Sequence, residues 1–159
     1  MSFFGLFQKG SPLPVGAPAP MLDALDQNGQ VIHFADLYAR SLVLVYFYPK
    51  ASTPGCTAQA CSLRDSFSSI SARGLEVLGV SADRPEAQKK FQSAYALPFP
   101  LVADYDGKVA DAFGVSRILG FTARQSFLIK DGKIAWVSLK AQTRDHAAEV
   151  QAAVDALIA

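Results

Sequence analysis

The chain has 159 residues, of which half are hydrophobic, and a net charge of +1. This length fits one domain with a substantial core, and the near-neutral charge gives no electrostatic case for binding nucleic acid or an anionic membrane. No apolar run approaches the roughly 20 residues of a membrane span, and the N-terminus lacks the basic region of a signal peptide. We therefore expect a single cytoplasmic domain over residues 1–159, without a membrane segment.

An arm and a hairpin are expected before the main body of the domain. Residues 1–20 carry four prolines and three glycines, which predicts an extended arm, and residues 1–15 form its N-terminal part. Asn28-Gly29 separates two short segments at 22–25 and 30–34, and this dipeptide is a strong signal for a hairpin turn. A short turn is expected over 35–39.

Strands and helices alternate after the hairpin. Residues 42–48 (LVLVYFY) form a continuous apolar run, which is typical of a strand buried on both faces. The elements expected next are a helix over 54–72 ended by Gly74, a strand over 75–81, a helix over 85–95 opened by a capping box at 83–86, a strand over 101–103, a helix over 108–113, strands over 125–130 and 133–138 joined by Asp131-Gly132, and a helix over 144–158. This order predicts an α/β domain with a thioredoxin-like fold: a mixed central sheet, helices on both faces and an N-terminal β-hairpin extension.

The junction between the first buried strand and the next helix carries a cysteine. Thr53 suits the N-cap, Pro54 suits the first helical position, and Cys56 then falls at the third. Unpaired backbone N–H groups and the positive end of the helix dipole lie within reach of this position. Such a site favours a thiolate, the nucleophilic form of cysteine. The alternative is that Cys56 and Cys61 are two small buried hydrophobic residues.

Cys61 lies five residues after Cys56, about 140° around the helix and on its polar flank. In an intact helix the two Cα atoms are roughly 8.7 Å apart, whereas a disulfide needs them within about 7 Å. The pair can therefore bond only if the first turn or two of the helix unwinds. A metal site is the weaker alternative, because His33 and His146 are lone residues without ligand spacing. We expect His33 to be an exposed strand residue and His146 a solvated helix residue, with no metal and no other cofactor.

The segment 48–61, YPKASTPGCTAQAC, resembles the active-site signature of the peroxiredoxins of the Q subgroup, also called bacterioferritin comigratory protein, in the AhpC/TSA-like family. Further segments that match the subgroup follow in the same order, at 63–65 (LRD), 77–83 (VLGVSAD), 113–115 (FGV), 124–129 (RQSFLI) and 131–134 (DGKI). The resemblance covers about residues 15–158, which is essentially the whole domain.

This resemblance implies a thioredoxin-dependent peroxidase that reduces hydrogen peroxide and organic hydroperoxides. Cys56 would be the peroxidatic cysteine, and Cys61 would be the resolving thiol that forms an intramolecular disulfide with it. The residues that would bind the peroxide are Pro49, Thr53, Gly55 and Arg124. Thioredoxin or a similar dithiol would recycle the enzyme, and we expect a monomer with a role in antioxidant defence.

The implied roles of three residues agree with elementary chemistry. Thr53 would orient the peroxide through its hydroxyl, and Pro49 would shield the thiolate from water. Arg124 would hold both the thiolate and the peroxide oxygens, because a rigid guanidinium stabilises negative charge on sulfur and on the leaving oxygen.

Four positions depart from the usual pattern of the subgroup, and two alternatives stay open. Ser126 replaces a common Thr, and Lys130 replaces a common Asp after the strand. Ala51 and Gln59 stand where Asp and Glu are common, and fewer carboxylates near Cys56 would reduce the repulsion of a thiolate.

The first alternative is a thioredoxin-like disulfide oxidoreductase. Such an enzyme would carry a C-x-x-C motif at this junction, but Thr53 stands at the position of the first cysteine. It would also carry a cis-proline before the penultimate strand, but no proline follows Pro100. A holdase or binding module on the same fold would leave the spacing of Thr53 and Cys56 unexplained.

Overall fold

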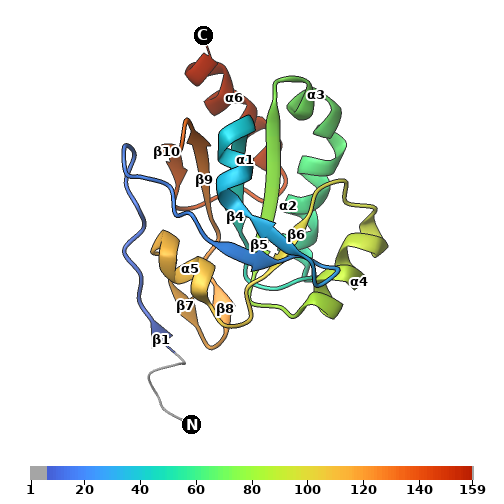
Figure 1. Cartoon of the computed structure of the whole chain (residues 1–159). Coiled ribbons are helices and arrows are strands. Elements are labelled where there is room, and N and C mark those ends of the chain that lie inside the picture. Colours follow the sequence, from blue (N-terminus) through green and yellow to red (C-terminus); the bar gives the residue numbers. More distant parts are fainter. Residues whose placement is uncertain (1–6, 159) are drawn as a thin grey trace.

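The computed structural model describes residues 7–158 and centres on a five-stranded sheet (Figure 1). The strands run in the order β10-β9-β4-β5-β6, with the bounds β4 Leu42–Phe47, β5 Leu75–Ser81, β6 Leu101–Ala103, β9 Gln125–Lys130 and β10 Lys133–Ser138. β4, β5 and β6 are parallel, whereas β9 is antiparallel to both β4 and β10. The mixed sheet and the thioredoxin-like fold predicted from the sequence are confirmed.

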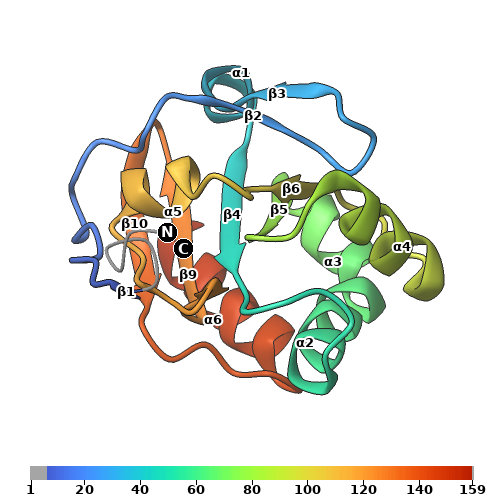
Figure 2. The ribbon, with the colours of Figure 1, turned by 90° about the horizontal axis from the view of Figure 1, so that it is seen from below.

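Helices cover both faces of this sheet (Figure 2). The helices are α1 Phe34–Arg40 and α5 Lys108–Phe113 on one face, and α2 Pro54–Asp65, α3 Phe67–Ala72 and α6 His146–Ile158 on the other, with α4 Pro85–Tyr95 beside β6. The alternation of side chains along β4 explains the two layers. Leu44 and Tyr46 enter the core under α2 and α6, whereas Val43, Val45 and Phe47 enter the core under α1 and α5. The two-sided burial expected from the apolar run is therefore confirmed.

Two small sheets flank the central one. β2 (Asp23–Leu25) and β3 (Val31–His33) form the expected hairpin, and the Asp26 carboxylate accepts the N–H groups of Asn28 and Gln30 in its turn. A three-stranded sheet of β1 (Phe7–Gln8), β7 (Arg117–Ile118) and β8 (Phe121–Thr122) was not expected from the sequence. Its strands are two residues long, too short for an alternating pattern to be recognised.

The N-terminal arm packs along the outer edge of β10. The Gly16 N–H donates to the Ile134 carbonyl at 2.8 Å, and the Ile134 N–H donates to the Ala17 carbonyl at 2.9 Å. Leu13 packs against the core under α1 and α5, and Ala19 lies within that core. The extended arm predicted from the sequence is thus part of the domain over its described residues, and its first six residues lie outside the description.

The helix expected over 54–72 is two helices, α2 and α3, because Ser66 interrupts it. Ser66 has non-helical backbone angles, φ −103° and ψ 7°, and serine is neutral to unfavourable inside helices because its hydroxyl competes for backbone hydrogen bonds. The apolar stripe still continues across the break, since Leu63 and Ile70 are both buried. No helix among the described residues is long and apolar enough to cross a membrane.

The turn expected over 35–39 is wrong, because these residues belong to α1. Phe34, Leu37 and Tyr38 recur at helical spacing and are buried. The last helix begins at His146, two residues later than expected.

Helix α4 has the expected bounds but lacks the expected capping box. Arg84 is the N-cap residue and its side chain makes no capping bond. The Asp83 carboxylate instead accepts the backbone N–H of Ala51 at 2.8 Å, in the loop that precedes Cys56.

We predict that Gly114→Ala destabilises the domain through the arm. Gly114 has φ +74°, and an added Cβ would collide with the carbonyl oxygen of Ser11. Gly29 is the matched control, because it has φ +73° and nothing within 4 Å of an added Cβ. Both substitutions should lower the free energy of unfolding by about 1–2 kcal/mol, because alanine is strained in the left-handed backbone conformation. Gly114→Ala should lower it by roughly 1–3 kcal/mol more, because its Cβ overpacks the contact with the arm. Urea unfolding measures both, and equal losses would contradict close packing of the arm.

Candidate active site

Cys56 lies where β4 leads into α2, and its side chain points into the core. It is the third residue of α2 and is 1% exposed, in the cluster that includes Tyr46 and Tyr48. Cys61 is on the same helix and is half-buried, and both cysteines are free thiols. The predicted orientation of Cys56 toward the sheet is confirmed, and the pair sits on one continuous stretch of helix.

Arg124 approaches Cys56 from the neighbouring strand. It directly precedes β9, and β9 pairs antiparallel with β4 so that Gln125 lies opposite Phe47. The start of β9 therefore lies beside the end of β4, where the Cys56 loop begins. The Arg124 Nη2 group donates to the Cys56 Sγ atom at 3.5 Å. The structure thus brings together two residues that are 68 positions apart in the chain.

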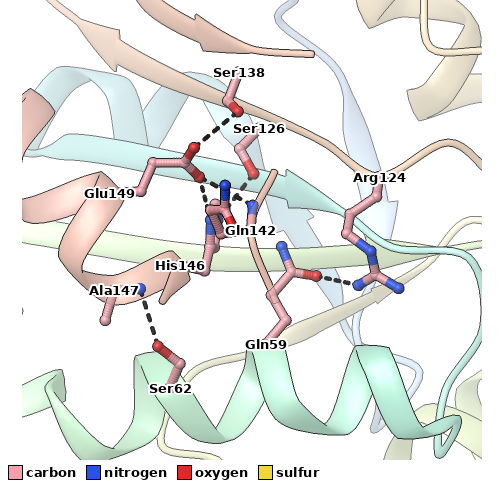
Figure 3. A network of polar contacts seen from close by, with 9 residues as sticks. All are labelled: Gln59, Ser62, Arg124, Ser126, Ser138, Gln142, His146, Ala147 and Glu149. Atoms are coloured by element: carbon pink, nitrogen blue, oxygen red, sulfur yellow. Dashed lines mark hydrogen bonds and ion pairs between the residues drawn. The ribbon is translucent and has the colours of Figure 1, made fainter. Parts of the chain in front are cut away.

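Gln59 fixes the other branch of the guanidinium. The Arg124 Nη1 group donates to the Gln59 Oε1 atom at 2.7 Å, and Gln59 is fully buried one turn after Cys56 (Figure 3). Among the described residues Arg124 has no carboxylate partner, so its positive charge is not neutralised by an ion pair. From the sequence, Gln59 was noted only as a departure from the pattern of the subgroup. Its position one helical turn after Cys56 could have indicated a role in the site.

Thr53 and Gly55 form the short approach to Cys56. Thr53 occupies the N-cap position as expected, but its side chain makes no capping bond and instead donates to the Lys50 carbonyl at 2.7 Å. The hydroxyl therefore closes the preceding turn. A Cβ at Gly55 would lie 3.0 Å from the Arg124 Nη2 atom, so glycine permits the close approach of the guanidinium to α2.

Pro49 lies at the start of the same loop, beside an open hollow of about 230 Å³. The residues that line this hollow are Pro49, Lys50, Ala82, Asp83, Leu119, Gly120 and Phe121. The β7–β8 hairpin therefore forms one wall of the hollow beside Pro49, and the loop before α4 forms another. Of the six residues implied by the resemblance, five lie between the end of β4 and Cys61 on α2, and the sixth, Arg124, directly precedes the neighbouring strand β9.

His146 is buried, so the expectation of a solvated histidine is wrong. It is the first residue of α6 and is 0% exposed. Its Nε2 atom lies 3.0 Å from the Ser126 hydroxyl, and its Nδ1 atom lies 2.8 Å from a Glu149 carboxylate oxygen (Figure 3). Burial lowers the pKa of His146 below its ordinary value and outweighs the opposing effect of Glu149. Helical spacing could not reveal this, because strand β9 covers the first turn of α6 with Ser126.

Helix α6 is also joined directly to α2. The Ala147 N–H donates to the Ser62 hydroxyl at 3.0 Å, next to Cys61 (Figure 3). His33 is exposed, as expected, and its Nδ1 atom lies 2.8 Å from the Asp23 carboxylate. Within the described part of the chain, no three His, Cys, Asp or Glu residues are grouped as metal ligands would be.

We predict that His146 and His33 have opposite effects on how the stability of the fold changes with pH. The pKa of His146 is lowered in the fold, so the unfolded chain binds its proton more tightly, and stability falls as the pH drops below about 6.5. The pKa of His33 is raised by Asp23, so its stabilisation is present below about 6.5 and is lost at higher pH. Chemical denaturation between pH 5 and 8 should show that His146→Gln removes the acid-side loss, whereas His33→Gln does not. An unchanged acid-side slope in His146→Gln would contradict this assignment.

The comparisons with known proteins agree with this geometry. Residues 15–137 match the model of the AhpC/TSA family. The chain is 42% identical to peroxiredoxin Bcp of Escherichia coli strain K12 over 144 residues, which are 86% of this chain and 92% of the relative. Among solved structures it is similar to peroxidoxin BcpB of Mycobacterium tuberculosis, with a TM-score of 0.83 and 30% identity over 94% of this chain and 97% of the other.

A second solved structure is an intermediate or ligand complex of the bacterioferritin comigratory protein of Xanthomonas campestris, described in terms of its alkyl peroxide reduction activity. The TM-score is 0.82 and the identity 25%, over 92% of this chain and 100% of that one. The fold, the family match and the curated relatives agree. The chain therefore belongs to the AhpC/TSA family as a peroxiredoxin of the Q, or bacterioferritin comigratory protein, subgroup, and is a thiol-dependent peroxidase.

Proposed function

We propose that Cys56 is the peroxidatic residue and that Arg124 stabilises its thiolate. The observation that carries this proposal is the 3.5 Å contact between the Arg124 Nη2 group and the buried Cys56 Sγ atom at a helix start. The thiolate attacks one peroxide oxygen, an S–O bond forms and the O–O bond breaks. The sulfur becomes a sulfenic acid, and the leaving oxygen takes a proton from water to give an alcohol or water.

The remaining substrate-binding residues act around this attack. Arg124 carries donors that are rigidly aimed, so it can stabilise the charge that develops on the leaving oxygen. We assign Thr53 to orient the peroxide through its hydroxyl, whose oxygen keeps acceptor capacity while its hydrogen bonds to Lys50. Pro49 and Gly55 complete the approach, Pro49 by limiting the access of water and Gly55 by leaving room for Arg124.

Cys61 is assigned as the resolving thiol. Its sulfur attacks the sulfenic sulfur of Cys56, an S–S bond forms, and the S–O bond breaks with the release of water. Both cysteines lie within the unbroken α2 helix, where Cα atoms five residues apart are roughly 8.7 Å from each other. The start of α2 must therefore unwind before the disulfide can form, since the bond needs Cα atoms within about 7 Å.

The Ser62 hydroxyl marks a natural end for this unwinding. It accepts the Ala147 N–H from α6, and the next residue, Leu63, is fully buried. Opening would thus be confined to residues 54–61, and it would break the contacts of Arg124 with Cys56 and Gln59. The last four residues of the helix, 62–65, would remain docked on the core.

A dithiol reductant would complete the cycle by thiol–disulfide exchange, and we propose thioredoxin or a similar protein for this step. Exchange restores the Cys56 and Cys61 thiols and leaves the reductant as a disulfide. We further propose that the protein acts as a single-domain monomer in the cytoplasm, with hydrogen peroxide and organic hydroperoxides as substrates and a role in antioxidant defence. The near-neutral charge and the two free cysteines are consistent with this setting.

Cysteine variants test the assignment of the two thiols. Cys56→Ser should abolish peroxide consumption, whereas Cys61→Ser should keep the first oxidation of Cys56 and block turnover driven by thioredoxin. Mass spectrometry of the peroxide-treated wild type should show a 56–61 disulfide within one chain. Full turnover by Cys61→Ser would remove its resolving role, and a disulfide between chains would overturn the proposed monomer.

Hydrogen exchange tests the opening of α2. In the oxidised protein the backbone amides of residues 57–61 should lose protection, because their helical hydrogen bonds must break for the disulfide to form. Amides of α6 after Val150 should keep their protection and serve as the internal control. Mass-spectrometric exchange of the reduced and oxidised forms measures both. A fully protected α2 in a protein that contains the 56–61 disulfide would refute the mechanism.

A further inference from the structure

A second polar network ends on the loop that precedes Cys56. Tyr48 donates to the Gln88 Oε1 atom at 2.5 Å, and the Gln88 side-chain amide donates to the Ser81 hydroxyl at 2.9 Å and to the Val102 carbonyl at 2.8 Å. The Ser81 hydroxyl donates to the Asp83 Oδ2 atom at 2.6 Å. The same Asp83 oxygen accepts the Ala51 N–H at 2.8 Å. The network therefore joins Tyr48, which directly follows β4, and the elements β5, β6 and α4 to the loop that precedes Cys56.

The direction of each hydrogen bond in this network is fixed. Tyr48, Ser81 and Gln88 are 0% exposed, so their polar atoms have to be satisfied within the protein. The Gln88 oxygen accepts from Tyr48 and its amide uses both hydrogens, so the single hydroxyl hydrogen of Ser81 is left for Asp83. The Asp83 carboxylate is consequently held as an acceptor, aimed at the Ala51 N–H.

The loop that Asp83 contacts has an unfavourable backbone conformation. Ser52 has φ +66°, in the left-handed region that a residue other than glycine adopts only when its surroundings impose it. Two hydrogen bonds fix the loop around Ser52. The Asp83 carboxylate accepts the Ala51 N–H, and the Thr53 hydroxyl donates to the Lys50 carbonyl. The first of these is anchored in the buried network, whereas the second is internal to the loop.

We propose that Asp83 is a positioning residue of the peroxidase. Its carboxylate holds the strained loop in the conformation that presents Thr53 and Cys56 to the peroxide, and this inference rests on the proposed function of Cys56. Asp83 itself contacts neither cysteine, and it acts through the backbone of Ala51. Without it the loop relaxes, which slows the reaction with peroxide and favours the opened form in which Cys61 reaches Cys56.

The proposal separates two steps that compete for the same sulfenic acid. While α2 is intact, the sulfenic acid of Cys56 stays apart from Cys61 and can react with a second peroxide. A second S–O bond then forms, the O–O bond breaks, an alcohol or water leaves, and the sulfur becomes a sulfinic acid. When the start of α2 is unwound, the same sulfenic acid condenses with the Cys61 thiol instead. Loss of Asp83 should therefore reduce the first rate constant and, at the same time, reduce the fraction of Cys56 that becomes sulfinic acid.

The test compares Asp83→Ala with Asp83→Asn and with Glu86→Ala. Asp83→Asn keeps an acceptor oxygen for the Ala51 N–H, and Glu86 is an exposed carboxylate in the first turn of α4. In the full chain, Asp83→Ala should lower the second-order rate constant for oxidation of Cys56 by hydrogen peroxide by about tenfold or more. Asp83→Asn should stay within about threefold of the wild type, because one hydrogen bond to the loop can still form. Glu86→Ala should match the wild type.

Intact mass spectrometry after a fixed excess of peroxide supplies the second readout. The ratio of sulfinic acid to disulfide should fall in Asp83→Ala and stay at the wild-type value in Glu86→Ala. Simple loss of folded protein lowers the amplitude of oxidation but changes neither the rate constant nor the product ratio of the molecules that remain folded. A wild-type rate constant or an unmoved ratio in Asp83→Ala would overturn the proposal. Peroxide consumption that survives Cys56→Ser would instead refute the proposed function.

Discussion

The site depends on one contact, between a thiol in the core and a guanidinium that reaches it from a different strand. Placing a cation beside an apolar core costs desolvation free energy unless the cation is hydrogen-bonded. Arg124 donates such a hydrogen bond to the Gln59 Oε1 atom at 2.7 Å. The antiparallel pairing of β9 with β4 then decides where the cation lies, because it places the start of one strand beside the end of the other. The sheet order, the helix start and the buried amide all serve this contact.

Side chains of three residues, Arg124, Ser62 and Asp83, form hydrogen bonds that hold the segment around Cys56. Arg124 contacts the first turns of α2 through Cys56 and Gln59, and these hydrogen bonds would have to break for the two cysteines to meet. Ser62 fixes the helix just after that segment through the first turn of α6. Asp83 fixes the loop just before it. The segment that is proposed to unwind is thus bounded on both sides by hydrogen bonds to other elements of the domain.

Much of this could be read from the sequence, and the failures share one physical cause. The buried strands, the helix start at Pro54 and the position of Cys56 follow from local patterns, so they were predictable. His146, Gln59 and Asp83 were misjudged or overlooked because their partners come from other elements. A histidine at a helix start and an aspartate before a helix have ordinary local explanations, as a solvated residue and as a cap. Only the tertiary structure replaces those explanations with Ser126 and Ala51 as partners.

The N-terminal arm has a consequence for how the molecule meets its own copies. A sheet with a free edge strand offers unpaired backbone groups to another chain, and this is a route to aggregation. Here the arm pairs with the outer edge of β10 through Gly16, Ala17 and Ile134, while the Gln27 side chain accepts the Leu101 N–H on the β6 edge. Both ends of the central sheet are thereby at least partly closed. In the proposed cycle the start of α2 opens at every turnover, and it can do so without also offering these edge positions to a neighbouring chain.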